Sequence, residues 1–345
     1  MRWDSLRLRE QDATGTADGG RQPPAALFGR DAVARTFDTP GFRGMTFYEV
    51  HARSIINKVP GPSRLPFRAT INPYRGCGHA CAYCFARGTH RYLDLDTGLD
   101  FNSKIIVKVN AAELARKELS GPRWAGEHIA MGTNVDCYQR AEGRYRLMPG
   151  IIGALRDARS PFSILTKGTL LLRDLDLLEE AAEVTDVGLS VSVGFTDAGL
   201  SRSVEPGTPS PARRLEACSQ ITSRGLRCGV LMGPVLPFLS DSPDQLAQTV
   251  RQIAGAGASS VSPIVLHLRP GAREWFLGWL AENHPALVAR YRALYGAGAY
   301  APRAYQQQIA AQVADLARHY GIGHPSPAAP RRPAPRPART ALPVS

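Results

Sequence analysis

The sequence predicts an α/β protein built as a partial, open (β/α)6 barrel of the TIM-like kind, with extra C-terminal helices. Six apolar, strand-like runs follow one another along the chain, and amphipathic segments with helix-start signals lie between them. Strand–helix units in series imply parallel strands joined by right-handed crossovers. Six units are too few to close the usual eight-fold barrel, so we expect an open one.

The elements of this barrel can be placed in order. Asn110 is expected to cap a helix, and Ser242, followed by proline, to start another that runs through Ala254. Residues 179–183 belong to the helix after the third strand, and 213–223 to the helix after the fourth. The expected strands are 68–74, 128–134, 162–167, 187–193, 227–233 and 259–266.

Composition divides the chain further. With 345 residues and 43% hydrophobic content, it can bury a sizeable core. The expected segments are a disordered leader (1–25), an N-terminal extension (26–67), the barrel (68–270), a helical segment (271–320) and a disordered tail rich in Pro and Arg (321–345). No apolar stretch is long enough for a membrane span and the N-terminus lacks a signal-peptide core, so we expect a cytoplasmic protein.

The formal net charge is +12, and residues 321–345 contribute four arginines and no acidic residue. The remaining positive bias is consistent with an anionic partner such as nucleic acid. However, only five of the 42 basic residues are lysine, so the arginine excess is equally explained by a GC-rich genome.

Three of the six cysteines, Cys77, Cys81 and Cys84, crowd into eight residues just after the first expected strand. In a reducing compartment this spacing, C-x3-C-x2-C, indicates a metal centre rather than disulfides. A structural zinc site needs four ligands, and His79 or His90 would have to complete it. Three thiolates instead suit an iron–sulfur cubane whose fourth iron has no protein ligand.

This cysteine spacing, with an aromatic residue, Tyr83, before the last cysteine, resembles the signature of the radical S-adenosylmethionine (SAM) superfamily. Between residues 68 and 270 the chain is similar to the subgroup related to spore photoproduct lyase, also described as DNA-repair-photolyase-like. The similar segments are NPYRGC-x3-C-x-YC, FNSKIIVKVNAAELARKEL, GTNVDCYQ, LTKGTLLLRDLDLL and VEPGTPSPARRLEA.

The resemblance implies a [4Fe–4S] cluster on Cys77, Cys81 and Cys84, with SAM chelated by the fourth iron. One electron, from a donor such as a flavodoxin or ferredoxin, then cleaves SAM to methionine and a 5′-deoxyadenosyl radical. That radical removes a hydrogen atom from the substrate. The protein positions the cofactor and excludes competing reactants.

The resemblance also suggests which residues contact SAM at the strand ends. Gly132 permits close backbone approach, and Thr133, Asn134 or Asp136 accept hydrogen bonds from the SAM amino group. The usual glutamate is absent there, and polar turn residues at a strand end explain the same composition. Lys167 can pair with the SAM carboxylate.

Four further positions complete the expected SAM pocket. Ser192 can donate to the carboxylate or the ribose, and Gly233 lets the adenine stack on bare backbone. Tyr83 is expected near the adenine. Glu205 and Arg214 pair with SAM or with one another, and an ion pair that anchors the loop is the favoured interpretation.

Cys137 is the candidate catalytic residue, because the related lyase uses a cysteine outside the cluster to return a hydrogen atom to a product radical. The alternative is an inert, buried thiol, as we expect for Cys218 and Cys228. His267 and Arg269 follow the sixth strand and either touch substrate or lie in a solvated loop.

Three functions remain open. The first is a radical SAM enzyme, of lyase or oxidoreductase type, that acts on nucleic acid, such as a lesion-repair lyase. The second is a radical SAM enzyme that modifies a small molecule or peptide. The third is a metal-binding interaction protein without catalysis.

Overall fold

The computed structural model describes residues 32–59 and 65–323. The expected leader lies outside these residues, as do all but three residues of the expected tail. The strands are β1 (Val33–Thr36), β2 (Thr46–Val50), β3 (Ile56–Lys58), β4 (Ala69–Ile71), β5 (Tyr74–Arg75), β6 (Lys104–Lys108), β7 (Ile129–Met131), β8 (Phe162–Thr166), β9 (Val187–Ser192), β10 (Cys228–Val235) and β11 (Ser260–Val265).

Helices connect these strands. The α-helices are α2 (Leu99–Ser103), α3 (Ala111–Ser120), α4 (Arg140–Tyr145), α5 (Leu147–Asp157), α6 (Leu175–Val184), α7 (Ala198–Val204), α8 (Pro211–Ser223), α9 (Pro243–Gly255), α10 (Ala272–Asn283), α11 (Val288–Tyr295) and α12 (Arg303–His319). Short 3₁₀ helices are η3 (Phe85–Leu93), η4 (Leu170–Asp174) and η5 (Pro285–Leu287).

The large sheet confirms the expected fold class. Its strands lie in the order β11-β10-β9-β8-β7-β4-β3, so all six expected strands are present and neighbours along the chain pair in parallel. β3 adds an antiparallel edge, pairing Ile56 with Ile71. The sheet stays open between β11 and β3 in the part of the chain described, as expected for six strand–helix units.

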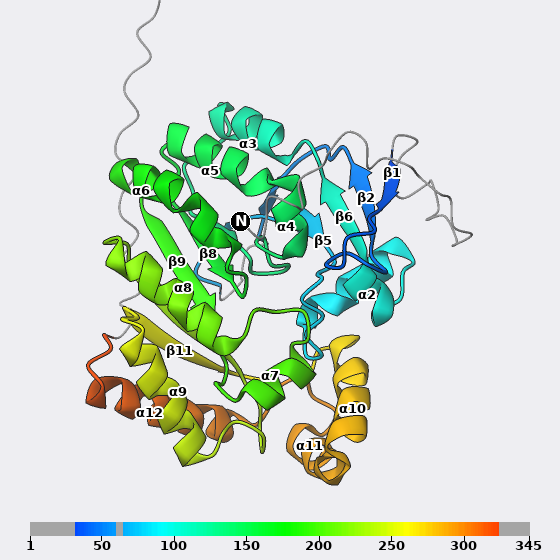
Figure 1. Ribbon diagram of the computed structural model, residues 1–345, viewed down its shortest axis with the longest axis vertical. Helices are drawn as coiled ribbons and strands as arrows, with labels where there is room; N and C mark the ends of the chain where they lie inside the picture. The colour runs from blue at the N-terminus through cyan, green and yellow to red at the C-terminus, as the bar shows by residue number, and fades with distance from the viewer. Residues whose placement is uncertain (1–31, 60–64, 324–345) are drawn as a thin grey trace, which may run out of the picture.

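Helices α3, α5, α6, α8 and α9 form an arc outside these strands (Figure 1). Ser242 caps α9 as expected, because its side chain accepts a hydrogen bond from Gln245 N and the Gln245 side chain reciprocates. Asn110 precedes α3, but its side chain exchanges two hydrogen bonds of 2.9 Å with the Ala52 backbone instead of capping the helix. The expected C-terminal helical segment forms α10, α11 and α12.

A second sheet, which the sequence did not indicate, has the order β1-β2-β6-β5. The expected strand 68–74 is divided between the two sheets: it ends at Ile71, and Tyr74–Arg75 pair antiparallel with Val107 and Ile106 of β6. Pro73 lies at this break and has no N–H to continue a ladder. The second sheet therefore supports the chain directly before the cysteine loop.

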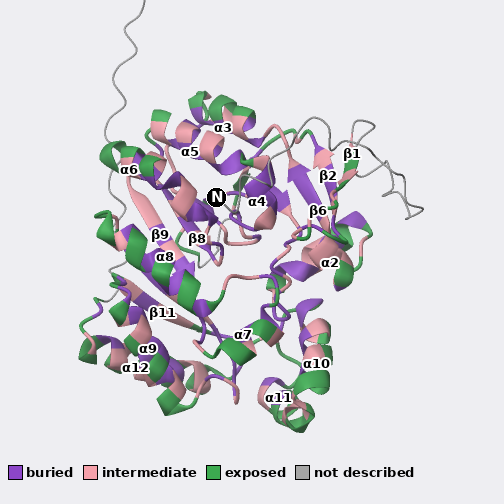
Figure 2. Cartoon of the chain, viewed as in Figure 1, coloured by how far each residue is buried: buried purple, intermediate pink, exposed green. Residues whose placement is uncertain are grey.

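The hydrophobic core is formed by buried side chains of the strands and of the helices that cover them, and Figure 2 shows the buried stretches of both in purple. Its fully buried side chains include those of Phe47, Ile71, Phe101, Phe162 and Met232. No helix among the described residues is both long and apolar enough to cross a membrane.

Candidate functional site

The cysteine loop, residues 76–84, lies between β5 and η3 and is held by the loop that follows β9. Gly207 N donates to His79 O at 3.0 Å, and Ala82 N donates to Val204 O at 2.9 Å. A Cβ atom at position 207 would lie 2.1 Å from the Gly78 carbonyl oxygen, so only glycine fits. The two loops are thus packed backbone against backbone.

The donor set on this loop fits an iron–sulfur cluster. Burial raises the pKa of all three thiols, that of Cys81 to about 12, so the thiolates form only with compensating positive charge or metal. Three soft thiolates on a largely buried loop are the ligands that such clusters use.

The two histidines proposed as alternative zinc ligands are engaged elsewhere. His79 Nε2 lies 3.1 Å from Asp136 Oδ2, and its Nδ1 lies 3.3 Å from Gly207 O. His90 Nε2 lies 3.1 Å from Lys104 O, and its ring packs edge-on against Phe101. Within residues 32–59 and 65–323, no three or more His, Cys, Asp and Glu side chains, the three cysteines included, are grouped to hold one metal ion. In an iron–sulfur cubane each cysteine binds a different iron.

A buried carboxylate, Glu205, joins the cysteine loop to the strand ends. It pairs with Arg214, accepts a hydrogen bond from the Tyr83 hydroxyl, and lies 3.4 Å from Lys167 Nζ. Burial alone would raise the pKa of Glu205, but Arg214 and Lys167 outweigh it and lower the pKa to about 2. The expected Glu205–Arg214 ion pair is therefore present and ionised.

Lys167, directly after β8, reaches across the ends of β9 and β10. Its Nζ donates to Ser192 Oγ at 2.5 Å and to Gly233 O at 3.1 Å, and it lies 5.7 Å from the centre of the Tyr83 ring. Ser192 Oγ donates in turn to Gly233 O at 2.8 Å. Tyr83, Lys167, Ser192, Glu205, Arg214 and Gly233, six of the sequence-predicted SAM contacts, thus meet in one network.

This network lies close to two of the cysteines. The negative charge of Glu205 raises the pKa of Cys81, after burial, while the cations of Lys167 and Arg214 lower it, and Lys167 also lowers that of Cys84. The structure therefore places these six residues beside Cys81 and Cys84.

Asp136, expected to face the SAM amino group, is already saturated by protein donors. Its Oδ1 accepts from Tyr138 N at 2.9 Å and Thr166 Oγ1 at 2.7 Å, and its Oδ2 accepts from Lys167 N at 2.6 Å and faces His79. Burial alone would raise the pKa of Asp136, but His79 and these hydrogen bonds lower it. In this structure Asp136 ties the cysteine loop to the end of β8.

The other residues after β7 differ in their surroundings. Gly132 has φ +79° and a Cβ there would lie 1.8 Å from Leu165 O, so the close approach of β8 already requires glycine. Thr133 and Asn134 are half-buried on the same turn.

Cys137, expected on the rim after β7, has no exposed surface in the structure. It is fully buried in the core cluster, and burial, followed by Asp136 and Glu142, raises the pKa of its thiol. Cys218 and Cys228 are also fully buried, as expected.

His267 and Arg269, after β11, both contact Tyr300. The His267 ring packs edge-on against Tyr300 with centroids 4.7 Å apart, and Arg269 Nη2 donates to the Tyr300 hydroxyl at 3.1 Å. Arg269 also lies 5.5 Å from the ring centre of Phe85, the residue after the last cluster cysteine. Arg269 therefore borders the cysteine loop.

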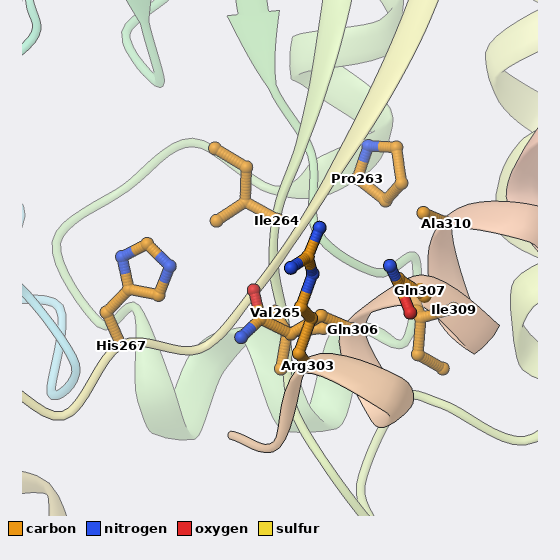
Figure 3. A pocket seen from close by; sticks show the side chains of 9 residues that line it. All are labelled: Pro263, Ile264, Val265, His267, Arg303, Gln306, Gln307, Ile309 and Ala310. Atoms are coloured by element: carbon orange, nitrogen blue, oxygen red, sulfur yellow. The ribbon is translucent and has the colours of Figure 1, made fainter. Parts of the chain in front are cut away.

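A cavity of about 400 Å³ lies between β11 and α12, lined by His267, Arg303 and Gln306 among others (Figure 3). Its lining includes His267 but none of the cysteines or expected SAM contacts. The cavity and the cysteine-centred site are thus separate features.

Sequence reasoning missed two contributors to the site, the His79–Asp136 contact and the buried Arg87. His79 lies between two cysteines, which was the available signal. Arg87 carries no signal, because an arginine in a polar segment is ordinarily exposed.

Comparisons with known proteins show the family of the chain and proteins to which it is similar. The model of the radical SAM superfamily matches residues 71–250. An uncharacterized protein of Mycobacterium tuberculosis is 50% identical over 313 residues, 91% of each chain. One of Methanocaldococcus jannaschii is 31% identical over 196 residues, 56% of this chain and 69% of that one.

Among solved structures, a variant of spore photoproduct lyase with dinucleoside spore photoproduct has a similar fold. Its TM-score is 0.60 with 15% identity, over 81% of this chain and 80% of that one. A variant of the same lyase with bound AdoMet and the dinucleoside has a TM-score of 0.58 with 16% identity, over 76% and 77%.

Proposed function

Because this chain belongs to the radical SAM superfamily, we propose that it is an enzyme that holds a [4Fe–4S] cluster on Cys77, Cys81 and Cys84 and acts on nucleic acid. When bound, the cluster and SAM supply reductive cleavage of a sulfonium C–S bond to a 5′-deoxyadenosyl radical. One observation carries the proposal: Tyr83, directly before Cys84, is hydrogen-bonded to Glu205, so the cysteine loop is joined to the Glu205 network at the strand ends.

The chain's own residues then bind and orient SAM. Lys167 pairs with the SAM carboxylate. Its side chain is 13% exposed, whereas that of Arg214, the other cation of the network, is 1% exposed. Thr133 and Asn134 accept from the amino group, because the oxygens of Asp136 are already occupied. Tyr83, fixed by its hydrogen bond to Glu205, offers its ring to the adenine.

Glu205 and Arg214 act by fixing this surface rather than by contacting SAM. The Arg214 guanidinium also donates to Ser192 O at 2.7 Å and Pro209 O at 3.0 Å, so it ties the loop after β9 to the end of β9. Both side chains have 1% exposure, which also keeps water from the inner wall of the site.

Nucleic acid is proposed as the substrate on three grounds. The chain carries a formal net charge of +12, and the lyase whose fold it shares was solved with a dinucleoside photoproduct. Arg269 and the exposed ring of Phe85, beside the cysteine loop, supply a cation and an aromatic face of the kind that bind bases and phosphates.

The test is product analysis with the anaerobically reconstituted, reduced chain. We expect cleavage of SAM to 5′-deoxyadenosine, and transfer of deuterium into it from a deuterated oligonucleotide substrate. Cys81→Ala is the negative control, and Cys218→Ala is the matched control that retains cleavage. Cleavage of SAM without binding to DNA or RNA at low salt would refute the nucleic-acid assignment and favour a small-molecule or peptide substrate.

A further inference from the structure

Arg87 is a fully buried cation. Its side chain has no exposed surface, and no Asp or Glu oxygen in the described part of the chain forms an ion pair with it. A buried charge without a counter-charge is costly, so a position of this kind ordinarily has an anion beside it.

The contacts that hold Arg87 are all to neutral groups. They fix its orientation and satisfy its N–H donors, but they leave its charge uncompensated. They are Cys81 O (3.3 Å from Nε and 3.0 Å from Nη2), Gly98 O (2.8 Å), Asn102 Oδ1 (2.9 Å), Thr97 O (3.1 Å), Ala80 O (3.4 Å), and the rings of Trp275 (4.7 Å) and Phe101 (5.2 Å).

Arg87 lies against the cysteine loop. Its backbone N donates to Cys84 O at 3.3 Å. The Asp96 carboxylate accepts a hydrogen bond from Gly98 N at 2.8 Å. Two of the hydrogen bonds of Arg87 run to the backbone carbonyl of Cys81 itself.

We infer that Arg87 is the built-in counter-charge of the iron–sulfur cluster and raises its reduction potential. The inference rests on the proposed function, because it requires the cluster on Cys77, Cys81 and Cys84. Reduction adds one electron, and therefore one negative charge, taken from a low-potential one-electron donor. A fixed cation in a buried site stabilises this more negative state more than the oxidised one. Arg87 is thus a positioning residue for charge, and it touches neither SAM nor substrate.

The test is a redox titration of the reconstituted full-length chain without SAM, with the reduced cluster quantified by EPR. In Arg87→Gln the ratio of reduced to oxidised cluster at a fixed potential should fall about tenfold, equivalent to about 59 mV. Arg87→Lys keeps the charge and should stay close to the wild-type value. Arg156→Gln, which removes a cation from a surface ion pair, is the matched control and should not shift the ratio.

The other outcomes of this experiment also support or overturn the role of Arg87. A cluster that assembles with Lys but not with Gln at position 87 also supports the inference, because the positive charge is then required. Equal potentials in wild type and Arg87→Gln would overturn it, and so would failure of both variants to assemble a cluster, since the role would then be structural. If the wild-type chain itself holds no cluster, the proposed function fails instead.

Discussion

Two networks of charged side chains in this protein differ in the sign of their net charge. In the scaffold network, Arg173 bonds to two carboxylates, Glu142 and Asp174, and the hydroxyls of Tyr74 and Tyr138 donate to them. In the site network, the single carboxylate of Glu205 faces two cations. The scaffold therefore carries one excess negative charge and the site one excess positive charge.

The difference separates a structural role from a binding role. The excess negative charge of the scaffold is relieved internally: burial raises the pKa of Glu142, and its oxygens accept from Leu147 N and Met148 N at the start of α5. The two cations of the site donate to neutral oxygens, but among the described residues they share the single carboxylate of Glu205. The excess positive charge lies beside the cysteine loop, where an anionic ligand such as the SAM carboxylate would neutralise it.

The largest effect should come from breaking the scaffold network. Arg173→Met leaves Glu142 and Asp174 without their cation, and we expect the free energy of unfolding to fall by about 3–5 kcal/mol. Urea denaturation of the apoprotein measures this. Arg156→Met, in a surface ion pair, should cost less than about 1 kcal/mol. A loss below that value in Arg173→Met would show that the network contributes little to folding.

Glu205 should make the site network sensitive to acid. Its folded pKa of about 2 lies below the ordinary 4.5, so its stabilising contribution is complete above pH 4.5 and is lost as the pH falls towards 2. We expect the free energy of unfolding of wild type to exceed that of Glu205→Gln by about 3 kcal/mol at pH 7. This difference should disappear as the pH falls from 4.5 towards 2. A gap that stays constant down to pH 2 would contradict the ionised pair.

Removing the partly exposed cation should weaken ligand binding more than folding. In Lys167→Met we expect the Kd for SAM to rise about tenfold, about 1.4 kcal/mol, with iron content unchanged. Lys108→Met is the matched control: this lysine, on β6 of the other sheet, is half-buried, and burial lowers its pKa to about 8. Equal SAM affinity in wild type and Lys167→Met, measured by equilibrium dialysis, would exclude Lys167 from the SAM site.

The smallest effect is expected at Cys137, whose pKa responds to Asp136 on the site side and Glu142 on the scaffold side. Its burial predicts that Cys137→Ala costs about 1 kcal/mol of stability and leaves SAM cleavage unchanged. The hydrogen-donor role stays a prediction from sequence. An altered product distribution at unchanged SAM cleavage would establish it.

The repeated strand–helix units of the large sheet could be predicted from the sequence. Six buried parallel strands appear as apolar runs, and Ser242 with Pro243 marks a helix start by chemistry that is entirely local. The second sheet was not predicted, because its strands β2 and β6 come from segments 54 residues apart and pair only in the folded chain. Non-local pairing of this kind leaves no periodicity in a short window.

The site divides in the same way. The cysteine loop, Lys167 and the Glu205–Arg214 pair were predictable because their residue types and spacing imply their chemistry. The saturation of Asp136 and the burial of Cys137 and Arg87 were not, because each depends on tertiary packing. A charged residue such as Arg87 is identified as functional only when its lack of a carboxylate partner can be seen.

The most direct measurement is the metal and sulfide content of the anaerobically purified chain. We expect about four iron and four acid-labile sulfide per chain, both lost together in Cys77→Ala, Cys81→Ala or Cys84→Ala. Stoichiometric zinc with neither iron nor sulfide would contradict the assignment of the three cysteines to an iron–sulfur cluster.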